Sequence, residues 1–292
     1  MPGVPLVSIV IPCRNEGPYL QQTLRSLLMA KTGISYEVIV VNDGSTDGCC
    51  DFLGARDYGV TCLQSSGMGV SGARNFGAGA ASGEILCFCD AHLIFEDYWL
   101  DKLVAPIVHE EAELVCPGIA SAANPQAIGY GVTWDDKLNW QWLYREPVKV
   151  TYVPLVPGAC LMVRRDVFKD LNGFEKGFHV FGYDDQEFSL KAWLFGYRAA
   201  VAPGVKIIHV FRQKSPYPVS WLDLVHNMLR MAFLHFNQKR IGKAIEASKL
   251  HRGFGETLAG LLFSDVWAIR RSYLARRCYD DDWFMDHFGI NF

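Results

Sequence analysis

The sequence predicts an α/β fold in which a mostly parallel sheet is flanked by helices and followed by a helical C-terminal part. Short continuous apolar runs, at 7–11, 37–41 and 85–89, are typical of strands buried on both faces of a parallel sheet. Helical patterns separate these runs, which indicates strand–helix–strand units. From Trp221 onward the pattern is mostly helical.

Size and composition favour one large globular domain. The chain has 292 residues, half of them hydrophobic, and it contains no internal repeat and no low-complexity linker. The net charge of -3 gives no bulk electrostatic basis for binding nucleic acid. We therefore expect a single domain whose partners are small molecules or other proteins.

The cysteines and the N-terminus indicate a soluble, cytoplasmic protein. Nine cysteines, an odd number, lie largely within apolar runs, as expected for reduced thiols in a reducing compartment. Cys49-Cys50 and Cys87-x-Cys89 lack a second pair at zinc spacing, so no structural zinc site is expected. Residues 1–5 contain no basic signal region, and no apolar run is long enough for a transmembrane segment.

The first two strands are expected to end in polar loops. Pro12 is predicted to end the first strand, and a helix is predicted to begin at Pro18. The second strand breaks into Asp43, which places this carboxylate at a strand tip beside the first strand. The glycine-rich segment 67–80 resembles a phosphate loop, but its small residues favour close packing of a helix on the sheet, with a polar contact from Arg74 or Asn75.

The strand at 85–89 breaks directly into Asp90-Ala91-His92. In extended backbone Asp90 and His92 point to the same side, where a carboxylate and an imidazole can share a divalent metal ion. The alternative is that Asp90 caps the following turn and His92 is a surface residue.

The middle of the chain is less regular. A helix is predicted at 99–108 and a strand at 114–116, while 119–150 is expected to be irregular and rich in aromatic residues. These aromatics either contact a sugar or peptide or cover the far side of the sheet. The small residues 157–159 would allow a ligand to approach the backbone before the next strand.

Three carboxylates gather at a predicted helix start. Asp184, Asp185 and Glu187 follow a glycine-aromatic loop, and they exceed what capping and the helix dipole require. The last strand-like run, 205–212, contains His209, which on an apolar strand is usually a satisfied core histidine.

Taken together, these segments resemble GT-A glycosyltransferases of the family 2 type, and more closely the catalytic domain of polypeptide N-acetylgalactosaminyltransferases. The likeness covers nearly the whole chain and depends on the order and spacing of its motifs. The matching segments are 8–16, 41–45, 90–92, 115–117, 134–140, 158–159, 209–217 and 227–232. The family's Gly-Gly-Glu-Asn is replaced by Gly182-Tyr183-Asp184-Asp185, and its lectin domain and membrane anchor are absent, which indicates a soluble, bacterial-type enzyme.

The resemblance implies a Rossmann-like GT-A domain over 1–292, with a nucleotide-binding half (1–106), an acceptor-side half (107–214) and a C-terminal helical part (215–292). It implies that Asp90, His92 and His209 hold Mn²⁺ or another divalent metal, and that the donor is a UDP-sugar. Asp43 would accept hydrogen bonds from the uracil or ribose. The residues expected to bind metal and donor are Pro12, Arg14, Asn15, Glu16, Asp43, Gly69, Arg74, Asp90, Ala91, Gly158, Arg212 and Tyr217.

The catalytic role of Asp185 is open. As a general base it would take the acceptor's proton and give inversion, as in many family 2 enzymes. The polypeptide-transferase relatives carry Asn at the matching position and retain configuration, and Asp185 could also be a helix cap. Asp184 would hold sugar hydroxyls in either case.

Three functions are therefore weighed. The leading hypothesis is metal-dependent transfer of a sugar from a UDP-sugar to a Ser, Thr or Cys side chain of a peptide or protein. A second is an inverting family 2 enzyme that extends a saccharide or lipid-linked glycan. A third is a catalytically inactive protein that binds nucleotide sugars.

Overall fold

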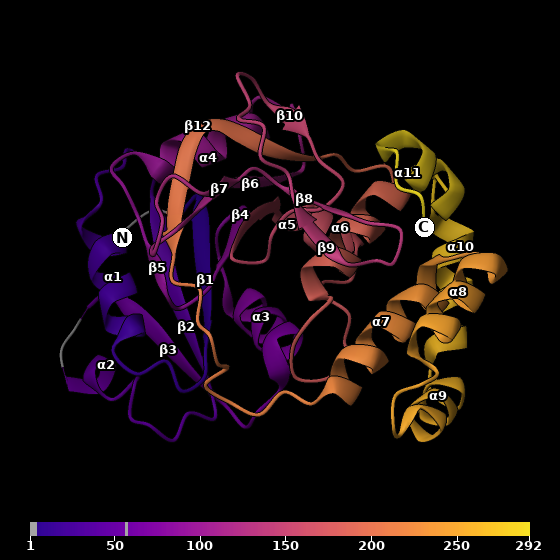
Figure 1. Cartoon of the computed structure of the whole chain (residues 1–292). Helices are drawn as coiled ribbons and strands as arrows, with labels where there is room; N and C mark the ends of the chain where they lie inside the picture. Colours follow the sequence, from indigo (N-terminus) through magenta and orange to yellow (C-terminus); the bar gives the residue numbers. More distant parts are fainter. Residues whose placement is uncertain (1–4, 56–57) are drawn as a thin grey trace.

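The structure is a computed structural model that describes residues 5–55 and 58–292 (Figure 1). Residues 1–4, in which the sequence shows no signal region, lie outside the described part. The strands are β1 (Val7–Cys13), β2 (Tyr36–Asp43), β3 (Val60–Ser65), β4 (Ile85–Cys89), β5 (Leu93–Ile94), β6 (Leu114–Ser121), β7 (Ile128–Gly129), β8 (Val132–Trp134), β9 (Trp140–Trp142), β10 (Thr151–Tyr152), β11 (Cys160–Arg164) and β12 (Ala199–His209). The helices are α1 (Tyr19–Met29), α2 (Phe52–Ala55), α3 (Gly69–Ala80), α4 (Trp99–Val108), α5 (Arg165–Asp170), α6 (Asp184–Leu194), α7 (Trp221–His235), α8 (Gln238–Ser248), α9 (Phe254–Leu262), α10 (Val266–Arg276) and α11 (Asp281–Phe288).

One large sheet organises the molecule. Its main path has the order β10-β12-β6-β11-β4-β1-β2-β3, and β5 and β7 pair with β12 and β6 beside this path. The β4–β1, β1–β2, β2–β3 and β12–β6 pairs are parallel, whereas β11 runs antiparallel to β4 and β6. The predicted mostly parallel sheet is confirmed, with β11 and the short strands as its antiparallel members.

Helices cover both faces of this sheet (Figure 1). Along β4, Leu86 and Phe88 point into one core, which includes residues of α3, α5, α6 and α7. Cys87 and Cys89 point into the other core, which includes residues of α1 and α4. The alternation follows from the two-residue period of a strand. It explains why β4, buried on both faces, is apolar throughout.

Two prolines lie inside strands rather than ending them, which corrects the sequence prediction. β1 continues through Pro12 to Cys13, but its pairing with β4 stops at Val10, so Pro12 has a neighbouring strand on one side only. β6 continues through Pro117, and there its ladder with β12 is irregular. A bulge tolerates the missing proline N–H.

The C-terminal helices pack on the α6 side of the sheet (Figure 1). A capping box between Ser220 and Asp223 begins α7, and this helix packs against α8, α9 and α10. The buried Arg230 of α7 donates to Glu175 and Asp265, at 2.7 and 2.8 Å. This pairing ties α7 to the segment that precedes α6, and so to the wall of the cavity described below.

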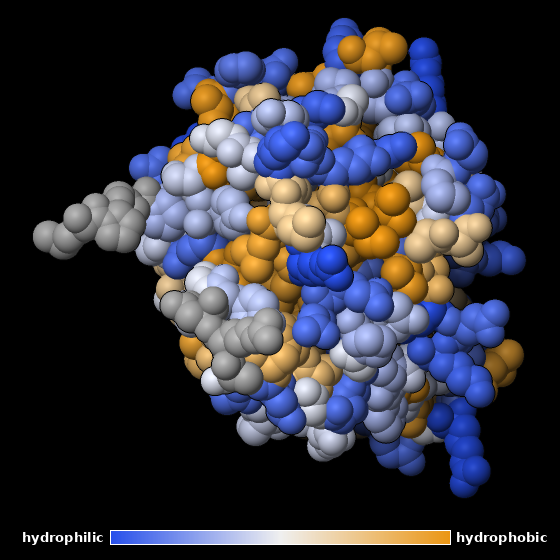
Figure 2. Space-filling view, turned by 90° about the vertical axis from the view of Figure 1, so that its left-hand side faces the viewer, coloured by the Kyte–Doolittle hydropathy of each residue, from blue (hydrophilic) through white to orange (hydrophobic). Residues whose placement is uncertain are grey.

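Within the described ranges, none of the helices has both the length and the apolar character that crossing a bilayer requires. All nine cysteines fall in the described part and are free thiols. Figure 2 shows the side of the molecule on which α1 lies in Figure 1, where hydrophilic residues surround an apolar central area.

Candidate active site

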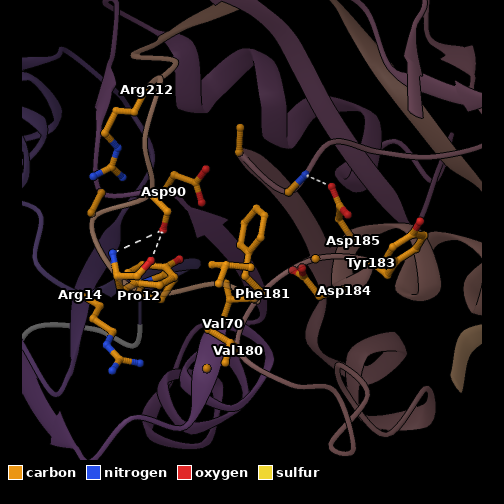
Figure 3. Close-up of a pocket in the computed structure, with 18 of the residues that line it drawn as sticks. Pro12, Arg14, Val70, Asp90, Val180, Phe181, Tyr183, Asp184, Asp185 and Arg212 are labelled. Carbon is orange, nitrogen blue, oxygen red and sulfur yellow. Dashed lines mark hydrogen bonds between the residues drawn. The ribbon is translucent and has the colours of Figure 1, made fainter. Parts of the chain in front are cut away.

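The carboxyl ends of β1, β2 and β4 lie at the same edge of the sheet, since these strands are parallel neighbours. They open onto a cavity of about 660 Å³. Figure 3 shows Pro12, Arg14, Asp90 and Arg212 along one side of this cavity. Tyr183, Asp184 and Asp185 lie on the other side, across from Asp90, with Phe181 between (Figure 3). Such an edge is where open α/β sheets bind ligands.

Strand pairing brings the Asp-x-His segment to His209. β5 pairs with β12 so that Leu93 lies opposite His209, and the carbonyl of His92 accepts a 3.1 Å hydrogen bond from the N–H of Val210. Oδ2 of Asp90, directly after β4, lies 3.3 Å from Nε2 of His209 and 3.9 Å from Nε2 of His92. One ligand atom from each residue lies within 4.8 Å of the other two. The three side chains therefore face one common point.

The electrostatic surroundings keep Asp90 ionised. Burial raises the pKa of this carboxyl, but the hydrogen bond from His209 and the neighbouring His92 and Arg74 side chains outweigh burial and hold its pKa well below the usual range. Nδ1 of His209 is buried and has no hydrogen-bond partner among the described residues. The arrangement offers an anionic oxygen and two imidazoles, a donor set that suits a divalent cation.

A second carboxylate, that of Glu16, contacts the Nδ1 side of the His92 ring. Nδ1 of His92 lies 3.1 Å from Oε2 of Glu16 and 2.8 Å from Nη2 of Arg212. The same guanidinium donates to Oε1 of Glu16 at 2.9 Å. Glu16 is 5% exposed, so its two oxygens are committed to these partners. Carboxylates in this position commonly orient metal-binding imidazoles.

Arg74 joins the two sides of the cavity. Its side chain, 2% exposed, pairs with Asp184, donates to the carbonyl of Gly158 at 2.7 Å, and lies 3.4 Å from Oδ1 of Asp90. A Cβ at Gly158 would lie 3.2 Å from both terminal nitrogens of Arg74 and 3.1 Å from Cβ of Asp185. A larger residue at this position would therefore displace both side chains by a few tenths of an ångström.

The two aspartates at the start of α6 have raised pKa values. Burial and the neighbouring charge of Asp184 raise the pKa of Asp185 to about 7. Burial raises the pKa of Asp184 as well, although Arg74 opposes it. The N–H of Gly158 donates to Oδ2 of Asp185 at 2.7 Å (Figure 3). Asp185 can therefore change protonation near neutral pH.

Asp43 and Gly69 anchor the turn before α3. The Asp43 carboxylate, 3% exposed, accepts from the N–H groups of Gly67, Met68 and Gly69 at 2.7–3.1 Å. A Cβ at Gly69 would lie 2.9 Å from the carbonyl oxygen of Val180. A Cβ at Gly77 of α3 would lie 2.4 Å from Cγ1 of Val10 in β1, which confirms the expected close packing of this helix on the sheet. Hydrogen bonds from a ligand to Asp43 remain a prediction, and the structure shows that this carboxylate also shapes the cavity wall.

The segment after β12 folds back across the cavity mouth. The carbonyl of Pro216 lies 3.5 Å from Nδ2 of Asn15, and the Arg14 guanidinium lies 5.5 Å from the centre of the Tyr217 ring. Nε of Arg14 is buried, and it has no hydrogen-bond partner within the ranges that the structure describes. Burial raises the pKa of Tyr217 to about 12, so its hydroxyl stays protonated and can donate. Two arginines and a tyrosine therefore face the same space as Asp90.

The structure adds cavity residues that the sequence did not indicate as site residues. The loop that carries Phe181 is held by Asn227 of α7, whose Nδ2 donates to the carbonyls of His179, Phe181 and Gly182 at 2.8–3.2 Å. Val180 in this loop has a positive φ of 23°. The only indication in the sequence that Asn227 is important was that the segment 227–232 resembles the family. This segment lies far from the Phe181 loop in sequence.

The predicted aromatic segment divides between the two roles considered. Tyr130 and Trp134 are buried in the core, as expected of residues that cover the sheet. Trp140 and Trp142 line the cavity, and Trp140 is 37% exposed. The segment is also less irregular than expected, because β8 and β9 form a small antiparallel sheet.

The fold and the family define the class of the protein. The chain belongs to glycosyl transferase family 2, whose family model matches residues 8–171, more than half of the chain. A second model, described as the N-terminal domain of galactosyltransferase, matches residues 149–214. The predicted GT-A fold is confirmed by the structural likenesses that follow.

The most similar relatives include polypeptide N-acetylgalactosaminyltransferase 11 of Xenopus tropicalis, which is 27% identical over 319 residues, covering 98% of this chain and 50% of that protein. The probable N-acetylgalactosaminyltransferase 8 of Caenorhabditis elegans is 28% identical over 224 residues, covering 71% of this chain and 51% of that protein. The chain thus spans about half the length of the curated relatives it matches.

Among solved structures, GalNAc-T7 with UDP, GalNAc and Mn²⁺ matches with a TM-score of 0.78 and 20% identity, covering 99% of this chain and 57% of that one. TarS from S. aureus in complex with UDP-GlcNAc matches with a TM-score of 0.59 and 20% identity, covering 89% and 73%. At this identity the likeness establishes the fold.

Proposed function

We propose that the protein is a metal-dependent glycosyltransferase that transfers a sugar from a UDP-sugar to a Ser, Thr or Cys side chain of a peptide or protein. One observation carries the proposal: Asp90 and His92, which lie between β4 and β5, converge at the cavity with His209, which ends β12. Support comes from the polypeptide N-acetylgalactosaminyltransferases that the chain matches and from GalNAc-T7, which was solved with UDP, GalNAc and Mn²⁺.

The residues present fit a divalent metal such as Mn²⁺. A bound ion would supply Lewis-acid stabilisation of a leaving diphosphate. Nε2 of His92 is free to bind a cation only when its proton sits on Nδ1, and there Glu16 accepts that proton at 3.1 Å. In this tautomer Nδ1 cannot accept from Arg212, so the guanidinium, which can only donate, must move from its 2.8 Å position and keeps Glu16 as its partner. Glu16 thereby selects the metal-binding form of His92.

The remaining predicted residues surround the space that the donor would fill. Arg14, Arg212 and Tyr217 would donate to the diphosphate, and each charge-assisted contact contributes about 1.5–3 kcal/mol. The segment that carries Arg212 and Tyr217 would close over the donor and exclude water. Asp184 would hold sugar hydroxyls beside Arg74. The backbone and small side chains near the nucleoside and sugar would come from Pro12, Asp43, Gly69, Ala91 and Gly158, which line the cavity. Asn15 does not line the cavity, and its side chain contacts Thr46 and Pro216 in the adjoining loops.

The test is sugar transfer by the purified chain from a panel of UDP-sugars to peptide and glycan arrays, with and without Mn²⁺. We expect Mn²⁺-dependent transfer to peptides, detected as a mass shift. His209→Ala is expected to lower the rate by about 10³-fold, because a metal-stabilised charge contributes several kcal/mol. His109→Ala, at an exposed position on the surface, is the matched control. Full activity of His209→Ala would refute the proposal.

A second candidate is an inverting enzyme that extends a saccharide or lipid-linked glycan. The observation that favours it is Asp185, whose raised pKa suits a general base. Transfer to glycans without transfer to peptides would support this candidate and reject the peptide acceptor. Binding of UDP without transfer to any acceptor in the array would indicate an inactive binding protein.

We also propose that the protein works in a reducing compartment such as the cytoplasm. The support is that all nine cysteines are free thiols, seven of them buried. Thiol labelling of the protein in intact cells, followed by mass analysis, tests this: oxidised cysteines in the native protein would contradict it. The division at residues 106 and 214 likewise stays a prediction, to be checked by expressing the segments separately.

A further inference from the structure

Four cysteine side chains lie close to the loops that border the cavity. Cys13 ends β1, Cys49 and Cys50 form the turn before α2, and Cys62 lies in β3. The first three are at most 6% exposed. Cys62 is half-buried near Cys50, and its sulfur lies outside the group of three whose ligand atoms are all within 4.8 Å of one another. No sequence motif links these residues, because their ligand atoms come from three separate segments of the chain.

The sulfur atoms form a nearly regular triangle. The Sγ atoms of Cys13 and Cys49 are 3.5 Å apart, those of Cys13 and Cys50 are 3.6 Å apart, and those of Cys49 and Cys50 are 3.9 Å apart. Zinc–sulfur bonds of about 2.3 Å in tetrahedral geometry give a sulfur–sulfur edge of about 3.8 Å. The triangle therefore has the size of one face of a thiolate site, and Cys62 lies next to one of its corners.

One carboxylate holds the turn that carries two corners of this triangle, Cys49 and Cys50. Asp47 fixes the turn, since its carboxylate accepts from the N–H of Cys49 at 3.0 Å and from the N–H of Gly17 at 2.8 Å. Hydrogen bonds of this kind orient the ligands of a metal site.

A second cysteine cluster provides the contrast. Cys87, Cys89 and Cys160 also lie close together, with sulfur separations of 3.6 and 3.8 Å. All three are completely buried in the apolar core between the sheet and α1 and α4. Within the described part of the chain, none of these three cysteines is half-exposed and none lines the cavity, whereas Cys13 of the first cluster does. Van der Waals contact alone explains the spacing of the second cluster, whereas the first cluster also has an entry path for an ion.

We propose that Cys13, Cys49 and Cys50, joined by Cys62 after a shift of its side chain, bind one thiophilic divalent cation of the Zn²⁺ type. Binding forms metal–sulfur bonds and releases the thiol protons to solvent. The ion joins the end of β1, the loop after β2 and β3, and so braces the two loops that carry Arg14, Glu16 and Ser45. The site is distinct from the Asp90 centre and would act on loop stability rather than on sugar transfer.

The test is titration of the reduced, chelator-treated full chain with CdCl₂, in an Asp90→Ala, Cys278→Ser background. These changes remove the histidine-containing site and the exposed thiol. We expect one Cd²⁺ per chain, thiolate-to-metal charge-transfer absorption, and protection of the four cysteines from alkylation. Cys49→Ser is expected to weaken binding by at least about tenfold, whereas the matched Cys87→Ala leaves it unchanged.

Absence of the charge-transfer band, or equal Cd²⁺ binding by Cys49→Ser and the parent, would overturn the proposal. If a cysteine variant does not fold, alkylation mapping of the parent with and without CdCl₂ still decides, because protection must fall on these four residues and not on Cys87, Cys89 or Cys160. Formation of a disulfide within the cluster, with no metal uptake by the reduced chain, also overturns it. None of these results depends on transferase activity.

Discussion

Asp90 and Asp185 lie on opposite sides of one cavity, yet their surroundings shift their pKa values in opposite directions. Asp90 faces two imidazoles and Arg74, which hold its pKa well below the usual range. Asp185 is buried beside another carboxylate, which raises its pKa to about 7. Asp90 therefore stays negatively charged, whereas Asp185 can accept a proton.

This difference assigns chemistry by environment rather than by residue type. Pairs of titratable groups whose surroundings push their pKa values apart are typical of enzymes that need both a charge and a base. Arg74 lies between the sides and contacts both Asp184 and Asp90. The Arg74 guanidinium is paired with Asp184. Its positive charge therefore stabilises the ionised form of Asp185 less than that of Asp184. The following predictions test whether the two sides act separately.

The largest effect is expected at Asp185. Asp185→Asn should lower kcat by about 10²–10⁴-fold if this carboxylate is a general base. In the parent, the group is protonated below its pKa of about 7 and cannot accept a proton, so the rate should fall about tenfold per pH unit below pH 7 and level off above it. The pH–rate profile of parent and variant checks this.

In Asp185→Asn the acidic limb should disappear while Mn²⁺ dependence stays. Asp136→Asn, on an exposed position of the turn between β8 and β9, is the matched control. If the variant keeps both full activity and the acidic limb, Asp185 is a helix cap and the proposed difference between the two sides is wrong.

The next effect is expected at Glu16. Glu16→Gln keeps the size of the side chain but removes the negative charge that accepts the Nδ1 proton of His92. The Mn²⁺ concentration for half-maximal activity should rise by about 10–100-fold, as for other groups that orient metal-bound histidines. The acidic limb assigned to Asp185 should not move. Glu111→Gln, at an exposed position, is the control, and an unchanged Mn²⁺ dependence in Glu16→Gln would contradict the role.

Gly158→Ala tests the contact between the sides. The added Cβ would press on Asp185 and Arg74 at 3.1–3.2 Å, so both must shift by a few tenths of an ångström. We expect kcat to fall about tenfold, since small misplacements at a reacting centre are costly. Gly79→Ala, in α3 with no atom near the new Cβ, is the matched control. A larger loss of Mn²⁺ affinity than of kcat would show that the metal side depends on Gly158.

The smallest effect is expected at Asn227, whose side chain contacts only the loop that precedes Asp184 and Asp185. Asn227→Ala leaves three loop carbonyls without their side-chain donor and should loosen Phe181. We expect KM for the acceptor to rise about fivefold and stability to fall by about 1–3 kcal/mol. Metal affinity should be unchanged. Thermal unfolding and acceptor titration check this, with Asn124→Ala on an exposed turn as the control.

The sheet and several elements could be predicted from sequence because their signals are local. The bounds of β4 and α4 agree with the apolar run 85–89 and the helical pattern 99–108. The placement of Asp43 beside β1 followed from the parallel order of the first strands. The strand ends predicted at Pro12 and before Pro117 were wrong. Local propensity does not show that the pairing of β1 with β4 stops before Pro12, or that the ladder between β6 and β12 is irregular at Pro117.

Only part of the candidate site could be predicted from the sequence. The convergence of His209 with Asp90 was implied by the family likeness, not by periodicity, because it depends on β5 pairing with β12 across more than 100 residues. The support of His92 by Glu16 depends on side-chain packing that leaves no pattern in the sequence. For the same reason, the contact of Asn227 with the loop at Phe181 could not be predicted.

The antiparallel pairing of β5 with β12 limits where this chain can change in length. A one-residue insertion or deletion between His92 and Ile94, or just before His209, would turn one imidazole to the opposite face of its strand and separate the pair. The exposed connection at 122–126 imposes no such register. Natural variants of this fold should therefore accumulate insertions at 122–126 and keep the spacing around the two histidines constant.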